Sequence, residues 1–210
     1  MKKLFLLTLF TTLLFGYQYD AKLYVGLGGG SEVESYTNTN DISLDSTSAG
    51  FGVIKFGYGD QKAYAIEFAL NYIANSNHIF STSDGAKYSL DITFIKAYPL
   101  TSWFYPFAKV GFGAGEMEVN KATLGEGDIG INLTDDAKKL KRDRISYSSY
   151  NIGFGGYFPL SSTLEFEVSY LYRYNSYQSL DYNENGSNDI KTLKLKSHIN
   201  QIYFGINKRF

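Results

Sequence analysis

The sequence predicts an all-β protein, an eight-stranded antiparallel transmembrane β-barrel with up-and-down topology. Three observations support this prediction. Apolar and polar residues alternate with a period of two in eight separate segments, which is the pattern of half-buried strands. The connections between these segments alternate between long and short. A short apolar leader precedes the first segment, which indicates that the chain is exported.

The composition excludes several classes of function. The 210 residues include no Cys, which rules out disulfides, thiolate metal sites and Cys nucleophiles, and only 2 His, which disfavours a His-built zinc site. With 20 basic and 21 acidic residues the net charge is -1, which argues against binding to nucleic acid. Aromatic residues make up 17% of a chain that also has 21 Gly, a combination that calls for a structural explanation.

Residues 1–16 have the pattern of a removable signal peptide. Lys2 and Lys3 form its positive start, and an apolar run follows over residues 4–15. The alternative is a membrane anchor, but the run is shorter than the ~20 residues that a spanning helix needs. We therefore expect residues 1–16 to be removed and residues 17–210 to form the barrel domain.

The segment 63–73 shows the alternation clearly. A strand points every second side chain to the same side, whereas a helix would distribute the same residues around its circumference. The apolar face of this segment consists of Tyr64, Ile66, Phe68, Leu70 and Tyr72. The same pattern recurs in residues 22–30, 51–58, 88–94, 105–117, 146–158, 164–174 and 198–210.

The connections between these segments also follow a pattern. Short turns are expected near residues 59–62, 99–102 and 159–162. Long polar stretches are expected at residues 31–49, 74–86, 118–144 and 176–197. In an antiparallel arrangement this order places all the short turns at one end and all the long loops at the other. Outer-membrane barrels have this anatomy, with short periplasmic turns and long outer loops.

A soluble barrel or sandwich with its apolar face inward is the main alternative. The polar face, however, carries Gly and single charges, which suit a narrow interior. Aromatic residues also gather near the strand ends, as they do in the two aromatic girdles of membrane barrels. The predicted periplasmic girdle is Tyr58, Tyr64, Tyr98, Trp103, Phe104, Tyr157 and Phe158. The predicted outer girdle is Tyr72, Tyr88, Tyr147, Tyr174 and Tyr177.

The charged residues of the polar faces are expected to meet inside the barrel. They are Lys55, Glu67, Asp91, Lys109, Glu165, Glu167 and Arg173. Eight strands enclose a space that side chains just fill, and buried charges need partners, so we expect an ion-pair network that plugs the lumen. The spacing of Glu165 and Glu167 would also suit a catalytic acid/base pair, a less favoured interpretation.

The last segment ends in a run of alternating apolar residues that can serve a purpose besides forming a strand. Ile202, Phe204, Ile206 and the terminal Phe210 alternate, and together they resemble the signal that the outer-membrane assembly machinery recognises. Lys208 departs from that pattern, because an aromatic residue is usual there. Taken whole, residues 17–210 resemble the small OmpA-like and OmpX-like family of eight-stranded outer-membrane barrels. The resemblance implies the outer membrane of a Gram-negative bacterium, with its lipids and lipopolysaccharide as neighbours.

One loop pattern is compatible with calcium. Asp181, Asn183, Asn185 and Asp189, with Gly186 between them, resemble the ligand positions of an EF-hand-like loop. The twelfth position is Thr192 rather than a bidentate Glu, so any calcium affinity would be weak. The favoured alternative is a polar hairpin tip built on Asn185-Gly186.

No pattern points to catalysis, and we expect the protein not to be an enzyme. Ser197 and His198 are adjacent in a strand and would face opposite sides, so they cannot form a hydrolase pair. The basic end of the stretch 135–144 could contact lipopolysaccharide phosphates, with a solvated loop base as the alternative. The expected role is structural or surface interaction, through adhesion or envelope integrity, with four long outer loops contacting a surface or host ligand. A narrow channel and a lipid-acting enzyme are the other hypotheses.

Overall fold

A computed structural model describes residues 20–38, 46–74, 78–128, 132–133, 143–183 and 189–210. The predicted signal peptide lies outside these residues. The barrel strands are β1 (Lys22–Asn38), β2 (Thr47–Gly59), β3 (Tyr64–Ile73), β4 (Lys87–Ala97), β5 (Tyr105–Glu118), β7 (Arg144–Pro159), β8 (Leu164–Tyr177) and β11 (Leu195–Arg209). In the described part of the chain, no helix is long and apolar enough to cross a membrane.

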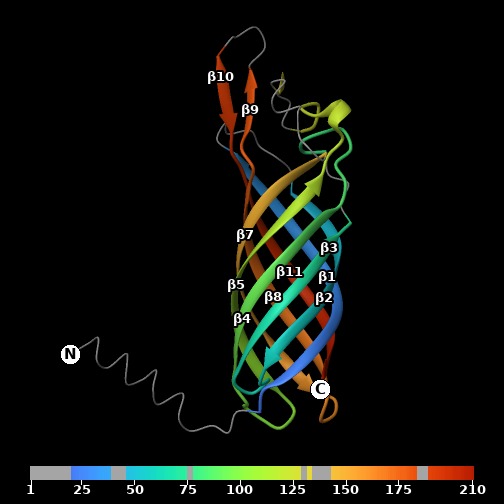
Figure 1. Cartoon of the computed structure of the whole chain (residues 1–210), viewed down its shortest axis with the longest axis vertical. Helices are drawn as coiled ribbons and strands as arrows, with labels where there is room; N and C mark the ends of the chain where they lie inside the picture. The colour runs from blue at the N-terminus through green and yellow to red at the C-terminus, as the bar shows by residue number, and fades with distance from the viewer. Residues whose placement is uncertain (1–19, 39–45, 75–77, 129–131, 134–142, 184–188) are drawn as a thin grey trace, which may run out of the picture.

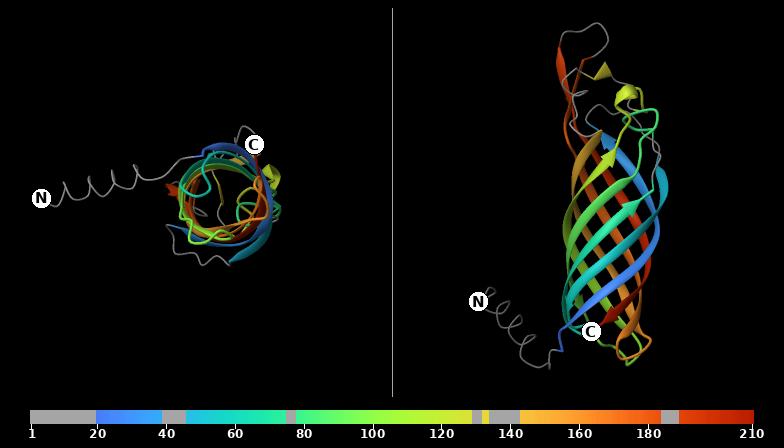
Figure 2. Two further views of the ribbon diagram at one scale, coloured as in Figure 1. Left: turned by 90° about the horizontal axis from the view of Figure 1, so that it is seen from below. Right: turned by 45° about the vertical axis from the view of Figure 1, so that its right-hand side comes forward.

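The eight barrel strands pair antiparallel with their neighbours, and β1 closes the barrel by pairing with β11, as predicted (Figure 1). Following the paired residues around the barrel from Leu27 leads back to β1 at Thr37, ten residues further along. A shift of this size requires steeply tilted strands, and the tilt is evident in Figure 2. The short turns lie at the same end of the barrel as the C-terminus, and the long connections lie at the other end.

Two of the predicted long loops are shorter than expected, because strands extend into them. The stretch 31–49 was predicted as a loop, but β1 continues to Asn38 and β2 begins at Thr47. The stretch 176–197 contains the hairpin of β9 (Leu180–Asn183) and β10 (Ile190–Leu193). The strand β6 (Asn132–Leu133) pairs with β9, and a short 3-10 helix, η1, covers Lys121–Thr123. The extension of β1 is mostly polar on both faces, and β9 and β10 are only four residues long, so none of them gives a clear amphipathic signal.

The barrel is polar inside and apolar outside. On β3, the charged Glu67 is 2% exposed, whereas its neighbours Ile66 and Phe68 are 49% and 46% exposed. The same alternation holds along β2, β4 and β11. A soluble barrel would show the opposite pattern, so the outward belt of large apolar residues faces lipid.

Most of the predicted aromatic girdles lie on the outer surface. Tyr58, Tyr98 and Trp103 are exposed at the short-turn end, and Tyr72 and Tyr88 are exposed toward the loop end. Phe104 lies against the outward face of the strand at the short-turn end, where a Cβ at Gly156 would come within 2.3 Å of its ring. This aromatic ring covers a backbone position that has no side chain of its own.

Three girdle assignments were wrong. Tyr157 was placed in the periplasmic girdle beside Phe158, although adjacent residues of a strand face opposite sides. In the structure Tyr157 is buried in the lumen and packs against Phe107, with ring centroids 4.4 Å apart. Tyr147 and Tyr177 were placed in the outer girdle, but both point into the barrel and are buried. Outward-facing Tyr150 and Tyr172 lie near that end instead, at 68% and 36% exposure.

Candidate functional site: the filled lumen and the outer cap

The lower part of the lumen, toward the short-turn end, contains a charge cluster centred on Glu167. Lys55 Nζ lies 3.0 Å from both carboxylate oxygens of Glu167, and Lys109 Nζ lies 3.5 Å from one of them. Lys55 also contacts Glu67 at 3.4 Å, and Tyr24 donates a hydrogen bond to Glu67. All of these charged side chains are nearly inaccessible to solvent, so each carboxylate is satisfied within the lumen.

A second ion pair lies below this cluster, and one of its members, Arg209, was not predicted. Arg209 Nε donates to Glu165 at 3.1 Å, and Arg209 also donates to the carbonyl oxygen of Gly59 at 2.9 Å. Asn207 donates to both Glu165 and Glu167, at 3.2 Å each. Because cations and the Asn207 amide contact the carboxylates of both Glu165 and Glu167, the arrangement supports an ion-pair network rather than an acid/base pair. Arg209 is out of phase with the alternating apolar residues Ile202, Phe204 and Ile206, so the alternation places it on the polar face, which is a usable signal.

The upper part of the lumen contains a further layer. Arg173 forms an ion pair with Asp91, and Asn71 donates to the same carboxylate at 2.7 Å. The structure therefore brings together all seven predicted interior charges, as two layers rather than one network. Between the layers lies a cavity of about 40 Å³, lined by Asn151 and Gln201 among others. It has room for on the order of three water molecules, which could satisfy the unpaired amide of Asn151.

A third layer, near the loop end, was not predicted. Lys87 forms an ion pair with Glu34 and donates to the Tyr36 hydroxyl at 3.2 Å. Tyr177 donates to Glu34 at 2.8 Å. Glu32, on the same face of β1, accepts a hydrogen bond from Gln201 at 2.6 Å. Glu32, Glu34 and Tyr36 were missed because the upper half of β1 was predicted as a loop, and Lys87 was missed because it lies just before the predicted strand 88–94.

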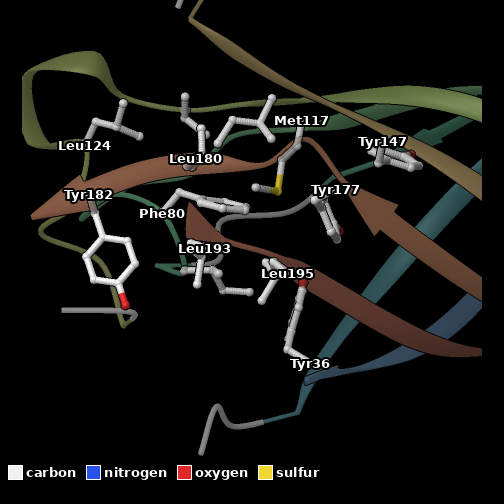
Figure 3. Close-up of a cluster of buried hydrophobic side chains, with 13 residues drawn as sticks. Tyr36, Phe80, Met117, Leu124, Tyr147, Tyr177, Leu180, Tyr182, Leu193 and Leu195 are labelled. Carbon is white, nitrogen blue, oxygen red and sulfur yellow. The ribbon is translucent and has the colours of Figure 1, made fainter. Parts of the chain in front are cut away.

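Above the third layer, an apolar cluster closes the outer mouth of the barrel (Figure 3). We call this cluster the outer cap. Its members are Tyr36, Ile79, Phe80, Met117, Val119, Leu124, Ile145, Tyr147, Tyr177, Leu180, Tyr182, Leu193 and Leu195. They come from the barrel rim, from the β3–β4 and β5–β7 connections, and from the β9–β10 hairpin. The long loops therefore share a hydrophobic core outside the apolar belt.

Polar contacts fix one of the loops that build the cap. Asp84 accepts a hydrogen bond from the backbone N–H of Phe80 at 2.8 Å and one from the Ser81 hydroxyl at 2.5 Å. Burial raises the pKa of the Asp84 carboxyl, although these hydrogen bonds act in the opposite direction. The backbone N–H of Gly125 donates to the Phe80 carbonyl at 2.7 Å, which joins this loop to the next one.

The calcium pattern lies on the β9–β10 hairpin. Asp181 is paired with Thr192 across the two strands, and the Thr192 hydroxyl donates to its carboxylate at 2.9 Å. Asn185 and the side chain of Asn183 lie outside the described residues. Strand pairing across the first and twelfth positions is the geometry of the hairpin alternative, and calcium binding by Asp181 and Asp189 stays a prediction. No group of three or more His, Cys, Asp or Glu residues that could hold a metal ion occurs among the residues that the structure describes.

The last strand presents its predicted assembly residues to lipid. Ile202, Phe204 and Ile206 are each about half exposed on the outer face, and Phe210 is 71% exposed. Lys208, the departure from the pattern, also faces outward and donates to the Thr163 hydroxyl at 2.8 Å. Recognition by the assembly machinery stays a prediction.

Neither candidate of a hydrolase pair is positioned for catalysis. Ser197 is fully buried in the lumen, whereas His198 faces outward and its Nδ1 lies 2.5 Å from the Tyr172 hydroxyl. The two side chains are on opposite sides of the barrel wall, as the sequence analysis expected.

A closed eight-stranded barrel with charges inside and a lipid-facing apolar belt is an integral outer-membrane protein. The chain belongs to the family of outer membrane protein beta-barrel domains, whose model matches residues 4–210, and its location is the bacterial outer membrane.

Several solved structures match this chain over most of its length, and the first of them has a similar fold. Neisserial surface protein A is 13% identical, with a TM-score of 0.55 over 91% of this chain and 99% of that chain. OprG from Pseudomonas aeruginosa is 13% identical, with a TM-score of 0.48 over 90% and 97%. Ail from Yersinia pestis, in complex with the heparin analogue sucrose octasulfate, is 12% identical, with a TM-score of 0.45 over 90% and 99%. No curated protein matches the sequence.

Proposed function

We propose that this protein is a non-conducting, non-enzymatic scaffold that holds its outer loops as an ordered platform for contact with surfaces outside the cell. The outer cap is the observation that carries the proposal. Loops that served only as connections would not need a shared hydrophobic core. Burying apolar residues from several loops together fixes their relative positions, which lowers the entropy cost of binding a partner.

The filled lumen supports the scaffold over the narrow channel. Described side chains that line the lumen provide six acidic and five basic groups, mostly in direct ion pairs: Glu32, Glu34, Glu67, Asp91, Glu165, Glu167, Lys55, Lys87, Lys109, Arg173 and Arg209. A passing ion would have to replace these contacts in each layer. The cap would then have to open as well.

The wild-type protein is therefore expected to give no stable conductance steps in planar bilayers at moderate voltage. Arg173→Ala, which removes the cation of the upper layer, is the comparison variant. Stable wild-type steps whose size changes in Arg173→Ala would contradict the closed scaffold and support the narrow channel.

The β9–β10 hairpin is the part of the platform to test for surface contact. It projects beyond the barrel (Figure 1), and Ile190, the first residue of β10 at the end of the hairpin away from the barrel, is 68% exposed. Replacing residues 183–190 by a two-residue Asn-Gly turn keeps Leu180 and Leu193, which belong to the cap. Cells that display the wild type should attach to glass or epithelial monolayers more than empty-vector cells do, and the shortened variant should lose that gain. Equal attachment of all three strains would overturn the proposed role.

A further inference from the structure

A face that is polar except for Val33 lies on the outer surface of β1, β11 and β8, close to the outer mouth. We call it the β11 polar face. Strand pairing arranges it in three rows of outward-facing residues: Thr37, Lys196 and Ser176, then Ser35, His198 and Tyr174, then Val33, Asn200 and Tyr172. The next outward residues below it on β11 are Ile202 and Phe204, which are about half exposed. The face therefore begins where the lipid-facing belt ends.

The charge of this face is positive among the residues that the structure describes. None of its nine positions is acidic. Lys196 is exposed and forms no ion pair with any residue in the part of the chain that the structure describes. Arg144 is the last residue of the basic stretch 135–144. Unlike Lys196, it forms ion pairs, with Glu116 at 3.1 Å and with Glu118 at 3.3 Å.

His198 is held in place beside Lys196. Its Nδ1 is hydrogen-bonded to the Tyr172 hydroxyl, and its ring lies 5.9 Å from the Tyr172 ring and 5.3 Å from the Tyr174 ring. The hydrogen bond occupies one ring nitrogen and leaves Nε2 for another partner. The imidazole therefore forms a fixed polar edge between a lysine and two aromatic rings.

The position of the face relative to the membrane indicates which partner it binds. Phosphate-bearing headgroups lie where the apolar belt of the outer leaflet ends, and lysines near a membrane surface attract anionic headgroups. We propose that the β11 polar face binds a phosphate of outer-leaflet lipopolysaccharide, with Lys196 as the cation and His198 and the neighbouring hydroxyls as hydrogen-bond partners. The proposed site on the barrel wall is separate from the phosphate contact predicted at residues 135–144, of which 135–142 lie outside the described residues. It depends on the membrane location and not on the proposed role of the loops.

The test measures binding of diphosphoryl lipid A to the detergent-solubilised mature protein by native mass spectrometry. Lys196→Gln should weaken this binding about fivefold, and Lys196→Gln with His198→Gln should weaken it further. Lys208→Gln is the matched control, because Lys208 is on the same strand and face but at the periplasmic end. Lipid A without phosphates should bind the wild type and Lys196→Gln equally. Heat-modifiable gel mobility verifies that every variant is folded.

Two outcomes would overturn the proposal. An equal loss of affinity in Lys208→Gln would show that lipid A responds to overall charge rather than to this face. Unchanged diphosphoryl lipid A binding by the folded double variant would show that the face does not recognise phosphate.

Discussion

Replacing Glu167 by Gln is expected to destabilise the folded barrel by about 3–5 kcal/mol. Glu167 is fully buried and is the shared partner of Lys55 and Lys109. Its removal leaves two buried cations with one carboxylate, that of Glu67, which forms an ion pair with Lys55. The cost comes mainly from the unpaired ammonium of Lys109, because a buried charge without a partner has lost its hydration and no ion pair compensates for that loss.

Urea unfolding of the protein in lipid vesicles would measure this effect. The single Trp of the sequence, Trp103, is 63% exposed in the periplasmic girdle, and its fluorescence should report insertion. Glu32→Gln is the matched control: Glu32 is similarly buried, but it accepts its hydrogen bond from the neutral Gln201. We expect that control to change stability by much less.

A double variant separates charge pairing from packing. Lys109→Met removes the orphaned cation, so Glu167→Gln combined with Lys109→Met should be more stable than Glu167→Gln. Equal destabilisation by Glu167→Gln and Glu32→Gln, with no recovery in the double variant, would mean that the ion pairs do not stabilise the lumen.

The sequence predicted the side on which most strand residues lie, because the alternation assigns each position to one face. Glu67 on β3 and Glu167 on β8 were placed inside the barrel for this reason. The partners of each charge could not be predicted. Lys55 and Glu167 are 112 residues apart, and their contact across the lumen depends on how closure of the barrel sets the relative heights of β2 and β8.

The upper half of the molecule was less predictable for a different reason. Beyond the lipid belt, β1 is polar on both faces: Glu34 lies inside and Ser35 lies outside. Without a contrast between faces, a strand has the same pattern as a loop. The outer cap was also hidden, because it is built from isolated apolar residues such as Phe80 and Leu193, which lie in different polar connections. Only the tertiary structure brings them together.

A pair of glycine substitutions on β2 tests the assignment of faces directly. Gly57 faces the lumen, and a Cβ there would come within 2.1 Å of the Tyr24 ring. Tyr24 lies across this position and donates to Glu67 at 3.1 Å. Gly57→Val should therefore displace the ring, break this buried hydrogen bond and destabilise the barrel by about 1–3 kcal/mol, since overpacking is costly in a filled interior.

Gly52→Val is the matched control, on the same strand and with the same change. Gly52 faces lipid, and a Cβ there would have no atom within 4 Å. A β-branched residue also suits a strand, so the change should alter stability by no more than about 0.5 kcal/mol. Urea midpoints in vesicles would compare the two variants. If Gly52→Val were the more damaging one, the inward and outward faces of β2 would have to be exchanged, and the polar lumen with its ion pairs would be lost along with them.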